Sequence, residues 1–438
     1  MGISDGFEAA TPGGGFRSHR PLDGCRPGWD KPALVETKET PMIQSGAWSR
    51  GGRLGTVILL TLLMHGPAVA APDLPAFVAG LWPAAARQGI PRPLFDGTFA
   101  GVTLDPTLAP LIRAQPEFAK PIGAYLQAQV TPGRIAQGRA VLATWHDVLA
   151  GVAADTGVPA ATLVAIWGLE TNYGTASGSK DVIRSLATLG ALGWRPELMR
   201  DELLAALTLL KDGAVARAQL RGSWAGAMGQ PQFMPSSFAK YAVDGDRDGR
   251  RDIWTDVPDA LASMANFLKQ QGWQAGQPWG FEVRLPPNFD MAQAHGGFAD
   301  WAARGLVRAD GGALPGAGDA TLFFPAGAAG PAFLVTANYP VIKTYNFSDA
   351  YVLSVVTLAD RIGGGAPLHA AWPNDPGLPR AARISLQARL AALGYPVDNR
   401  EGRISLGLRD TIRAAQAKAG LVPDGNPDAA LLRALPAP

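Results

Sequence analysis

One acidic side chain lies on a strongly apolar segment, where its chemistry would be unusual. The segment after Pro159 reads AATLVAIWGLETNYG, which predicts a helix with proline in its first turn and Gly174 as its stop. Glu170 falls near the C-terminal end of this helix, and Ile166 and Trp167 share its face. Apolar neighbours hydrate a carboxylate poorly, which raises its pKa. Glu170 is therefore a candidate general acid and base; the alternative is an exposed glutamate in the last helical turn.

A second segment has a composition suited to binding carbohydrate. Residues 223–238 read SWAGAMGQPQFMPSSF, and the glycines and prolines prevent a regular helix before Pro235. The loop is nevertheless apolar and carries amides, including Gln230 and Gln232. Such a loop can line a groove, because amides bind hydroxyls and aromatic faces bind sugar rings. A buried structural loop is the alternative interpretation.

A third segment, YNFSDAY, places polar and aromatic groups at a predicted helix start. Tyr345, Asn346 and Ser348 come where the helix begins, and Tyr351 lies one turn into it. Asn346 and Tyr351 can therefore point the same way and bind one ligand. Asn and Ser at a helix start are more commonly caps, which is the alternative.

An acidic loop follows part of the pattern of an EF-hand calcium loop. Aspartates fall at positions 1, 3, 5 and 9 and a glycine at position 6: Asp244, Asp246, Asp248, Asp252 and Gly249. Position 12 is Thr255, so closure of the ion's coordination would have to come from Asp256 or Asp259. The alternative is a solvated turn neutralised by its own arginines. Any calcium ion here would be structural, because the loop is far from Glu170 in sequence.

The elements that must position these groups are mainly helical. Helical periodicity runs from about residue 73 to residue 271 and returns over residues 348–362. Between about 281 and 340, short apolar runs bounded by Gly and Pro predict a small strand-containing insert. We therefore expect a mainly α fold with one main region over residues 73–362.

The C-terminal part of the chain is predicted to form a separate small module. Residues 363–380 (GGGAPLHAAWPNDPGLP and its flanks) have the composition of a linker. Residues 381–438 predict three short helices with apolar positions on each: Leu386, Leu390, Leu393, Ile412, Ala415, Leu431, Leu432 and Leu435. A unit of this size buries little core.

Taken together, the motifs resemble those of a known family. WGLETNYG, SLATLG, GAMGQPQFMPSSF, YAVDGDRDGRRDIW and YNFSDAY occur in the order typical of soluble lytic murein transglycosylases of the B type. The resemblance covers about residues 73–362 and implies a lysozyme-like helical catalytic domain. It implies that Glu170 is the catalytic acid and base. The substrate-binding residues it implies are Ser223, Gln232, Asn346, Tyr351, Tyr125 and, within the same motifs, Met228 and Arg195. The family often has paired basic residues where Arg195 is followed by Pro196 here.

The C-terminal module resembles a peptidoglycan-binding domain of type 1. LQARLAALGYPV, REGRIS, TIRAAQAKAGLVPDG and LLRAL carry the resemblance. The module departs from the family pattern at Glu401, Ser405 and Leu408. The resemblance implies that it holds the enzyme on polymeric murein, and we expect it to be dispensable for the chemistry.

The resemblance also implies a reaction without water and without a required cofactor. Glu170 would cleave the bond between N-acetylmuramic acid (MurNAc) and N-acetylglucosamine (GlcNAc), leaving 1,6-anhydro-MurNAc ends. Two other functions stay open. A hydrolytic muramidase would need a second carboxylate, such as Asp181. A non-catalytic cell-wall binding protein would rely on the C-terminal module alone.

The N-terminal residues predict export. Arg50 and Arg53 precede the apolar run of residues 54–64, and small residues end at Ala70. Eleven apolar residues are too few to cross a bilayer core, which needs about 20. We therefore expect residues 42–70, beginning at Met42, to be a signal peptide, and residues 1–41 to be disordered or to precede the true start. No cysteine follows for a lipid anchor, so we expect a periplasmic protein without a membrane anchor after cleavage.

Charge and composition exclude other classes. The 438 residues carry 39 Lys and Arg against 37 Asp and Glu, a net charge of +2. That balance gives no reason to expect nucleic acid as a partner. The single cysteine, Cys25, excludes an internal disulfide framework. We expect a monomer whose partner is the peptidoglycan glycan strand.

Overall fold

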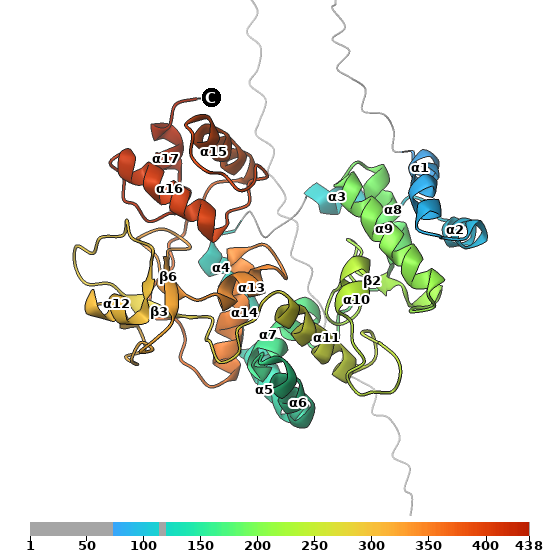
Figure 1. The fold of residues 1–438 in the computed structure, drawn as a ribbon, viewed down its shortest axis with the longest axis horizontal. Coiled ribbons are helices and arrows are strands. Elements are labelled where there is room, and N and C mark those ends of the chain that lie inside the picture. Colours follow the sequence, from blue (N-terminus) through green and yellow to red (C-terminus); the bar gives the residue numbers. More distant parts are fainter. Residues whose placement is uncertain (1–72, 114–119, 438) are drawn as a thin grey trace, which may run out of the picture. The chain divides into compact units, whose positions relative to one another are not determined.

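The computed structural model describes residues 73–113 and 120–437 (Figure 1). The predicted extension 1–41, the predicted signal peptide 42–70 and Cys25 lie outside the described residues. Within the described part of the chain, no single helix is long and apolar enough to cross a membrane. The helices His146–Thr156 and Ala160–Thr171 reach that length and hydropathy only together, and they are bent by 111° relative to each other.

The main region is helical, as the sequence predicts. Its helices are α1 (Leu74–Arg87), α2 (Arg92–Phe99), α3 (Leu108–Arg113), α4 (Ile122–Gln129), α5 (Pro132–Thr144), α6 (His146–Thr156), α7 (Ala160–Thr171), α8 (Val182–Ala191), α9 (Pro196–Lys211), α10 (Pro235–Tyr241), α11 (Val257–Gln270), α13 (Asn338–Lys343) and α14 (Asp349–Ile362). Two short antiparallel strands, β1 (Lys180–Asp181) and β2 (Arg221–Gly222), pair with each other.

Helix α7 lies at the centre of the main core. It is apolar on all sides, which is typical of a buried helix, and every residue from Thr162 to Gly168 is buried. It packs against α14, whose own buried residues include Val352, Leu353 and Val356, and against α5 and α6 (Figure 1). The position of any side chain near the end of α7 is therefore fixed by packing on several sides.

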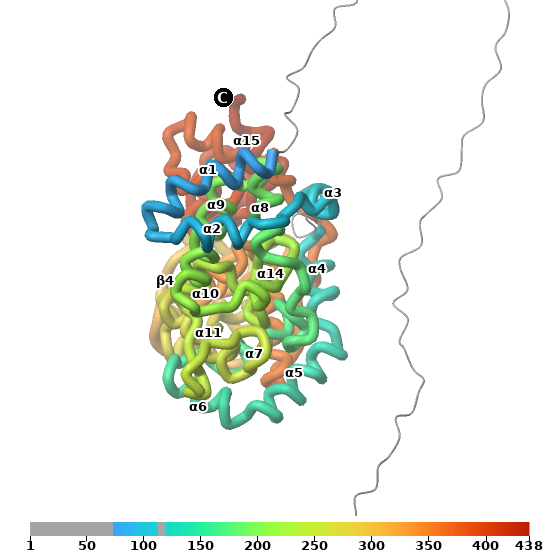
Figure 2. The backbone as a smooth tube through the Cα atoms, turned by 90° about the vertical axis from the view of Figure 1, so that its right-hand side faces the viewer, coloured from blue at the N-terminus to red at the C-terminus, as the bar shows by residue number. Residues whose placement is uncertain are grey.

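A second group of helices packs beside this core. Helices α8 and α9 pack along each other, α10 packs on α9, and α1 and α2 cross over the pair (Figure 2). The contact of α1 with α8 is close at Gly190, where an added Cβ would lie 2.1 Å from the ring of Phe77. A side chain at residue 190 would therefore separate these helices.

The predicted insert is a five-stranded antiparallel sheet. Its strands run in the order β4-β6-β7-β3-β5. Their bounds are β3 (Gly280–Arg284), β4 (His295–Gly297), β5 (Val307–Arg308), β6 (Asp319–Phe323) and β7 (Ala332–Val335). Helix α12 (Phe298–Ala303) covers the sheet and buries Trp301 in a small core of its own. The strand expectation for about 281–340 agrees with these bounds.

The C-terminal residues form three helices around a separate small core. They are α15 (Arg380–Ala392), α16 (Leu406–Lys418) and α17 (Ala429–Ala434). Leu386, Leu390, Ile412 and Leu431 are fully buried in this core. Leu393, by contrast, follows the end of α15 and is 45% exposed. The fold is thus mainly α, with a small sheet and a helical C-terminal module.

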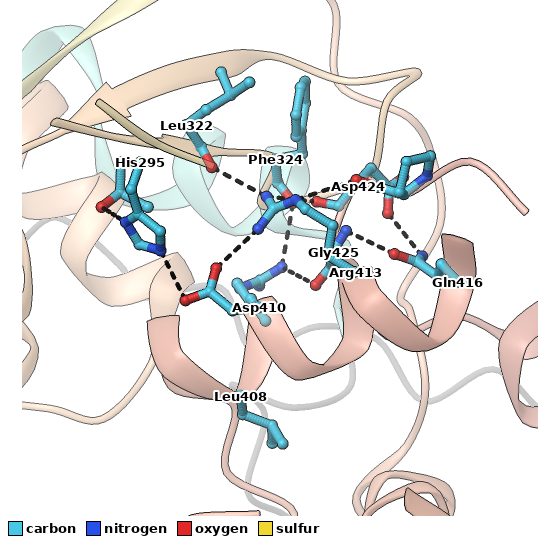
Figure 3. Close-up of polar contacts among 12 residues, drawn as sticks. His295, Leu322, Phe324, Leu408, Asp410, Arg413, Gln416, Asp424 and Gly425 are labelled. Carbon is cyan, nitrogen blue, oxygen red and sulfur yellow. Dashed lines mark hydrogen bonds and ion pairs between the residues drawn. The ribbon is translucent and has the colours of Figure 1, made fainter. Parts of the chain in front are cut away.

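The C-terminal module is held against the main region by buried polar contacts. Helix α16 lies beside the insert, where Arg413 donates to the carbonyl of Leu322 at 3.1 Å (Figure 3). Asp410 faces His295 of β4 across the same boundary, at 2.9 Å from its Nε2 (Figure 3). Arg409 forms a buried ion pair with Asp349 of α14 at 3.0 Å. The module is therefore docked and does not hang free from the main region.

The predicted linker, residues 363–380, also packs against the main region. It forms no helix or strand before α15 begins at Arg380. Leu368 and Trp372 nevertheless contact the main core, with the ring of Trp372 6.4 Å from that of Phe333. The Cβ of Trp372 lies so close to Gly123 that an added Cβ there would be 2.3 Å away. Composition indicated irregular backbone here but gave no sign of this packing.

Candidate active site

Glu170 is placed by the last turn of α7. The helix begins at Ala160, directly after Pro159, and ends at Thr171, with Asn172 in the left-handed conformation at φ 48°. It therefore stops before Gly174, the stop predicted from sequence. Ile166 and Trp167 are buried beneath the last turn, as the helical spacing predicts, and Glu170 itself is partly buried.

The close partner of Glu170 is Tyr351 on α14. The Tyr351 hydroxyl donates a hydrogen bond to Oε1 of Glu170 at 2.5 Å. Burial raises the pKa of Glu170 from its ordinary value of 4.5 to about 7, while the Tyr351 hydrogen bond opposes that rise. Glu170 can therefore both lose and accept a proton near neutral pH, which general acid–base catalysis requires.

Two tyrosines interact with this carboxylate, and a third lies next to one of them. Tyr345 and Tyr351 have pKa values raised well above 10 by burial and by the charge of Glu170. Tyr125 of α4 is close enough to raise the pKa of Tyr351 as well. The phenols of Tyr345 and Tyr351 therefore stay protonated and act as hydrogen-bond donors. Tyr345 donates to the Pro231 carbonyl at 2.7 Å, which joins the α13–α14 connection to the loop 223–238.

The loop 223–238 folds back on itself beside α7. The Oγ of Ser223 accepts a hydrogen bond from the Ala227 amide at 3.1 Å. The backbone of Met228 forms antiparallel β-bridges with Gly222 and with Phe233. Met228, which the resemblance implies as a substrate-binding residue, has no exposed surface, and its side chain lies in the main core. Ser223 remains partly exposed.

Two glutamines of this loop have different surroundings. Gln232, predicted to bind substrate, has a left-handed backbone at φ 54°, and its Nε2 donates to the carbonyls of Ser177 and Gly229. Gln230 is buried and its Oε1 has no hydrogen-bond partner. An added Cβ at Gly174 would lie 2.5 Å from that oxygen. Gly174 is thus required by close packing on Gln230, a contact that the sequence did not reveal.

The remaining predicted binding residues lie on different elements. Asn346 is partly buried and precedes Ser348, whose Oγ caps α14 by accepting from the Tyr351 amide. Arg195 is the N-cap of α9 in a left-handed conformation at φ 46°, and its guanidinium lies 5.2 Å from the ring of Trp194. Trp194 in turn contacts Trp224 of the loop 223–238 at 5.9 Å between ring centres. Asn346 and Tyr351 therefore share the α14 start, whereas Arg195 is connected through Trp194 to the loop 223–238.

The acidic loop brings together two of the four predicted aspartates and one of the two residues expected to close the coordination. Carboxylate oxygens of Asp244, Asp246 and Asp259 lie within 4.8 Å of one another. Asp252, one of the predicted ligands, instead accepts hydrogen bonds from the Trp254 and Thr255 amides. Asp248, another, accepts from the Arg250 amide and is not in the cluster. The EF-hand spacing predicted the loop, and α11 supplies Asp259, one of the two aspartates expected to close the coordination.

Asp181, the carboxylate considered for a hydrolytic reaction, makes contacts away from Glu170. It caps α8 by accepting from the Arg184 amide at 3.0 Å, and it forms an ion pair with Arg217 at 2.8 Å. Among the described residues, no carboxylate contributes to the pKa of Glu170. The site therefore contains one acid with tyrosines around it.

The fold and the site define the class of this protein. Residues 73–360 match the transglycosylase SLT domain, and residues 379–435 match a peptidoglycan binding domain. The chain therefore belongs to the transglycosylase SLT domain family, as a lytic murein transglycosylase of the B type with a C-terminal peptidoglycan-binding module.

Particular relatives agree with this assignment. The chain is 46% identical to SltB3 from Pseudomonas aeruginosa, with a TM-score of 0.73. The match covers 83% of this chain and 99% of the SltB3 chain. SltB3 was solved in complex with NAG-anhNAM-pentapeptide and with NAG-NAM-pentapeptide. Escherichia coli Slt35 in complex with calcium is 26% identical, with a TM-score of 0.56 over 68% of this chain and 95% of that chain.

A further relative is similar over a shorter stretch. The membrane-bound lytic murein transglycosylase B of Escherichia coli K12 is 38% identical over 160 residues. That stretch is 36% of this chain and 44% of the E. coli protein, so the match spans less than half of that relative.

Proposed function

We propose that this protein cleaves the β-1,4 bond between MurNAc and GlcNAc in peptidoglycan without water, and that Glu170 is both the acid and the base. The observation that carries the proposal is the position of Glu170. It is a desolvated carboxyl with a pKa of about 7, held by Tyr351, and no second carboxylate of the described residues acts on it. The relative SltB3, solved with NAG-anhNAM-pentapeptide, supports the same reaction.

The first half of the reaction breaks the glycosidic bond. Protonated Glu170 donates its proton to the bridging oxygen, and the bond between that oxygen and C1 of MurNAc breaks with the electron pair going to the oxygen. The 2-acetamido oxygen of the same sugar stabilises the positive charge that develops at C1. Tyr351 remains hydrogen-bonded to the carboxylate that Glu170 becomes.

The second half closes a ring within the product. The Glu170 carboxylate takes the proton from the C6 hydroxyl of MurNAc, and O6 forms the new bond to C1. The product ends in 1,6-anhydro-MurNAc, and the acid is regenerated for the next cycle. An intramolecular hydroxyl reacts at high effective concentration, so water activation by a second carboxylate is not needed.

The substrate contacts are assigned to partly exposed residues near this acid. Tyr125 and Asn346 lie on the elements next to Tyr351, and Ser223 and Gln232 belong to the loop that Tyr345 joins to the site. We assign the C-terminal module to retention on murein and the protein to the periplasm, since its substrate is the cell wall. The monomeric state remains a prediction.

A calcium ion fits the acidic loop as a structural element. Asp244, Asp246 and Asp259 offer hard oxygen ligands close together, and the pKa of Asp259 is raised by burial and by its acidic neighbours. A bound cation would relieve that repulsion and hold the loop to the start of α11. The chemistry of Glu170 does not require it.

The decisive experiment is product analysis with Glu170→Gln. The substitution removes the transferable proton and keeps the size and the hydrogen-bond acceptor for Tyr351. Turnover should fall by at least about 10²–10⁴-fold, since one group serves both proton transfers. Wild-type products from purified murein sacculi should carry anhydro ends, one water lighter than hydrolysis products. Reducing ends from the wild type would show a hydrolytic muramidase, and undiminished activity of Glu170→Gln would exclude Glu170 as the catalyst.

A further inference from the structure

A cavity lies at the ends of α7 and α14 that are remote from Glu170. Its volume is about 480 Å³, and sites for small molecules commonly have about 300–1,000 Å³. Thr162, near the start of α7, and Asp360, near the end of α14, both line it. Asp360 follows Tyr351 by nine residues on α14, which is about 13 Å at the rise of an α-helix. The cavity is therefore distinct from the catalytic site.

The sheet and the segment after α14 form the other walls of this cavity. Trp279, directly before β3, lines it, and residues 365–369 cover one side. Glu282 of β3 holds that segment, because its two carboxylate oxygens accept from the amides of His369 and Ala370, each at 2.7 Å. The segment that composition predicts as a linker is thus a wall of the cavity.

The sheet side of the cavity is aromatic. Trp273, Trp279 and Phe281 line it; Trp273 is buried, whereas the other two are partly exposed. The guanidinium of Arg308 lies 4.3 Å from the ring centre of Phe281 and covers that ring. Trp279 therefore offers the larger open aromatic surface, of the kind that packs against the C–H face of a sugar ring.

Asp360 is the carboxylate of this cavity with free acceptor capacity. It is exposed, and it accepts from the Nε1 of Trp279 at 3.2 and 3.4 Å, longer than a usual hydrogen bond. An ionised carboxylate has about four lone-pair sites, so most of those on Asp360 stay open to a ligand. Desolvation raises the pKa of Asp360 to about 6, as expected for a carboxylate on a concave wall, and it is still ionised at neutral pH.

The charges of the lining select among ligands. Three carboxylates, Asp360, Glu282 and Asp310, face one guanidinium, that of Arg308, which is paired with Asp310. An anionic ligand is therefore disfavoured, and a purely apolar one would leave Asp360 without hydrogen-bond donors. Gln277 adds an amide that makes no side-chain hydrogen bond to another described residue. A neutral molecule with several hydroxyls and one apolar face fits this lining.

We propose that this cavity binds a GlcNAc unit of the glycan strand, as a second sugar site separate from the catalytic groove and from the C-terminal module. The inference rests on the function proposed above, which supplies the sugar. GlcNAc is neutral, whereas MurNAc carries a carboxylate or a peptide with carboxylates, which the three acidic side chains would repel. Trp279 would pack on the sugar ring, Asp360 would accept from its hydroxyls, and Gln277 would bind its acetamido group.

The first test measures binding of a sugar that the enzyme has no bond to cleave in. N,N′-diacetylchitobiose contains GlcNAc alone, and full-length protein labelled with 5-fluorotryptophan reports its binding by fluorine NMR. The Trp279 resonance, identified with Trp279→Phe, should shift to saturation. Asp360→Asn keeps an acceptor for Trp279 but loses the charge, so the dissociation constant should rise at least about tenfold. The matched control is Asp155→Asn, an exposed aspartate in the last turn of α6, which should bind as wild type does.

A second series defines the chemistry of the ligand. Gln277→Ala should weaken binding of N,N′-diacetylchitobiose several-fold, because it removes the amide without touching the contact of Asp360 with Trp279. Maltose, a neutral disaccharide without acetamido groups, should bind the wild type more weakly. Turnover of short soluble murein fragments by Asp360→Asn should equal that of wild type, since the cavity is remote from Glu170.

Several outcomes would overturn the proposal. A Trp279 resonance that does not move with N,N′-diacetylchitobiose would do so, and so would equal dissociation constants for Asp360→Asn and wild type. If n-butylammonium moves the resonance and the sugar does not, the cavity is a cation site. Reducing ends in the murein products would overturn the proposed function instead, and the sugar titration, which needs no cleavage, would still decide whether the cavity binds GlcNAc.

Discussion

The hydroxyl of Tyr351 lies 2.5 Å from Oε1 of Glu170, although 181 residues separate them in the chain. One comes from the first turn of α14 and the other from the last turn of α7, two helices that pack against each other in the core. This contact joins two motifs that sequence analysis had to treat separately. It also makes Tyr351 a group that adjusts the acidity of Glu170.

Tyr351→Phe should move the pH profile to higher pH. The hydrogen bond lowers the pKa of Glu170, so its removal should raise that pKa above about 7. Activity requires the protonated acid, so the alkaline limb of kcat/KM should shift upward by about one pH unit. Tyr395→Phe in the C-terminal module is the control. An unchanged or downward-shifted limb would contradict this role of Tyr351.

Glu170 should make the folded state less stable at alkaline pH. Its pKa in the folded protein, about 7, lies above its ordinary value of 4.5, so the folded state binds the proton more tightly. The resulting stabilisation is complete below about pH 4.5 and is lost as the pH rises through 7. Glu170→Gln should therefore be more stable than wild type at pH 8, by about 1–3 kcal/mol, and this difference should vanish near pH 4.5.

Chemical denaturation at pH 4.5, 6 and 8 measures this difference. Glu401→Gln, a change of an exposed glutamate in the module, is the control. If Glu170→Gln and wild type unfold with the same free energy at every pH, Glu170 is not desolvated in the folded protein.

Removing the C-terminal module should lower stability, although the sequence predicts that the module is dispensable for the chemistry. A chain ending near Gly365 loses Arg409, which leaves Asp349 with Lys343 as its remaining buried cation. It also loses Trp372 and the contacts of that residue with the main core. Breaking a buried pair costs about 3–5 kcal/mol, so the melting temperature should fall by several degrees.

The truncated chain can be compared with Arg409→Ala in the full chain. Both should have a lower melting temperature than wild type, because both leave Asp349 without one of its cations. Equal melting of truncated and full-length protein would show that the docking seen here contributes no stability.

Calcium should raise the melting temperature without changing turnover. An ion that binds only the folded state, at a concentration 100 times its dissociation constant, stabilises that state by about 2.7 kcal/mol. Asp246→Asn should reduce the effect, whereas Asn in place of the exposed Asp155 should not. Identical melting curves in calcium and in chelator would show that the loop does not bind calcium.

The sequence alone determined the helix that carries Glu170, because its apolar neighbours and flanking Pro159 are local signals. It also determined the mainly α fold, the position of the strand insert and the three C-terminal helices, since periodicity and turn residues act over short distances. The spacing of Asp244 and Asp246 likewise predicted an acidic loop. All these features depend on residues close together in the chain.

Only the tertiary structure decided which distant groups meet. The contact of Tyr351 with Glu170 and the burial of Met228 depend on how helices pack, which no local pattern encodes; packing also selects Asp259 over Asp256 as the neighbour of Asp244. The docking of Arg409 on Asp349 could not be predicted for the same reason. Glycine-rich composition predicts irregular backbone, but the burial of an ion pair depends on which surfaces meet once the whole chain has folded.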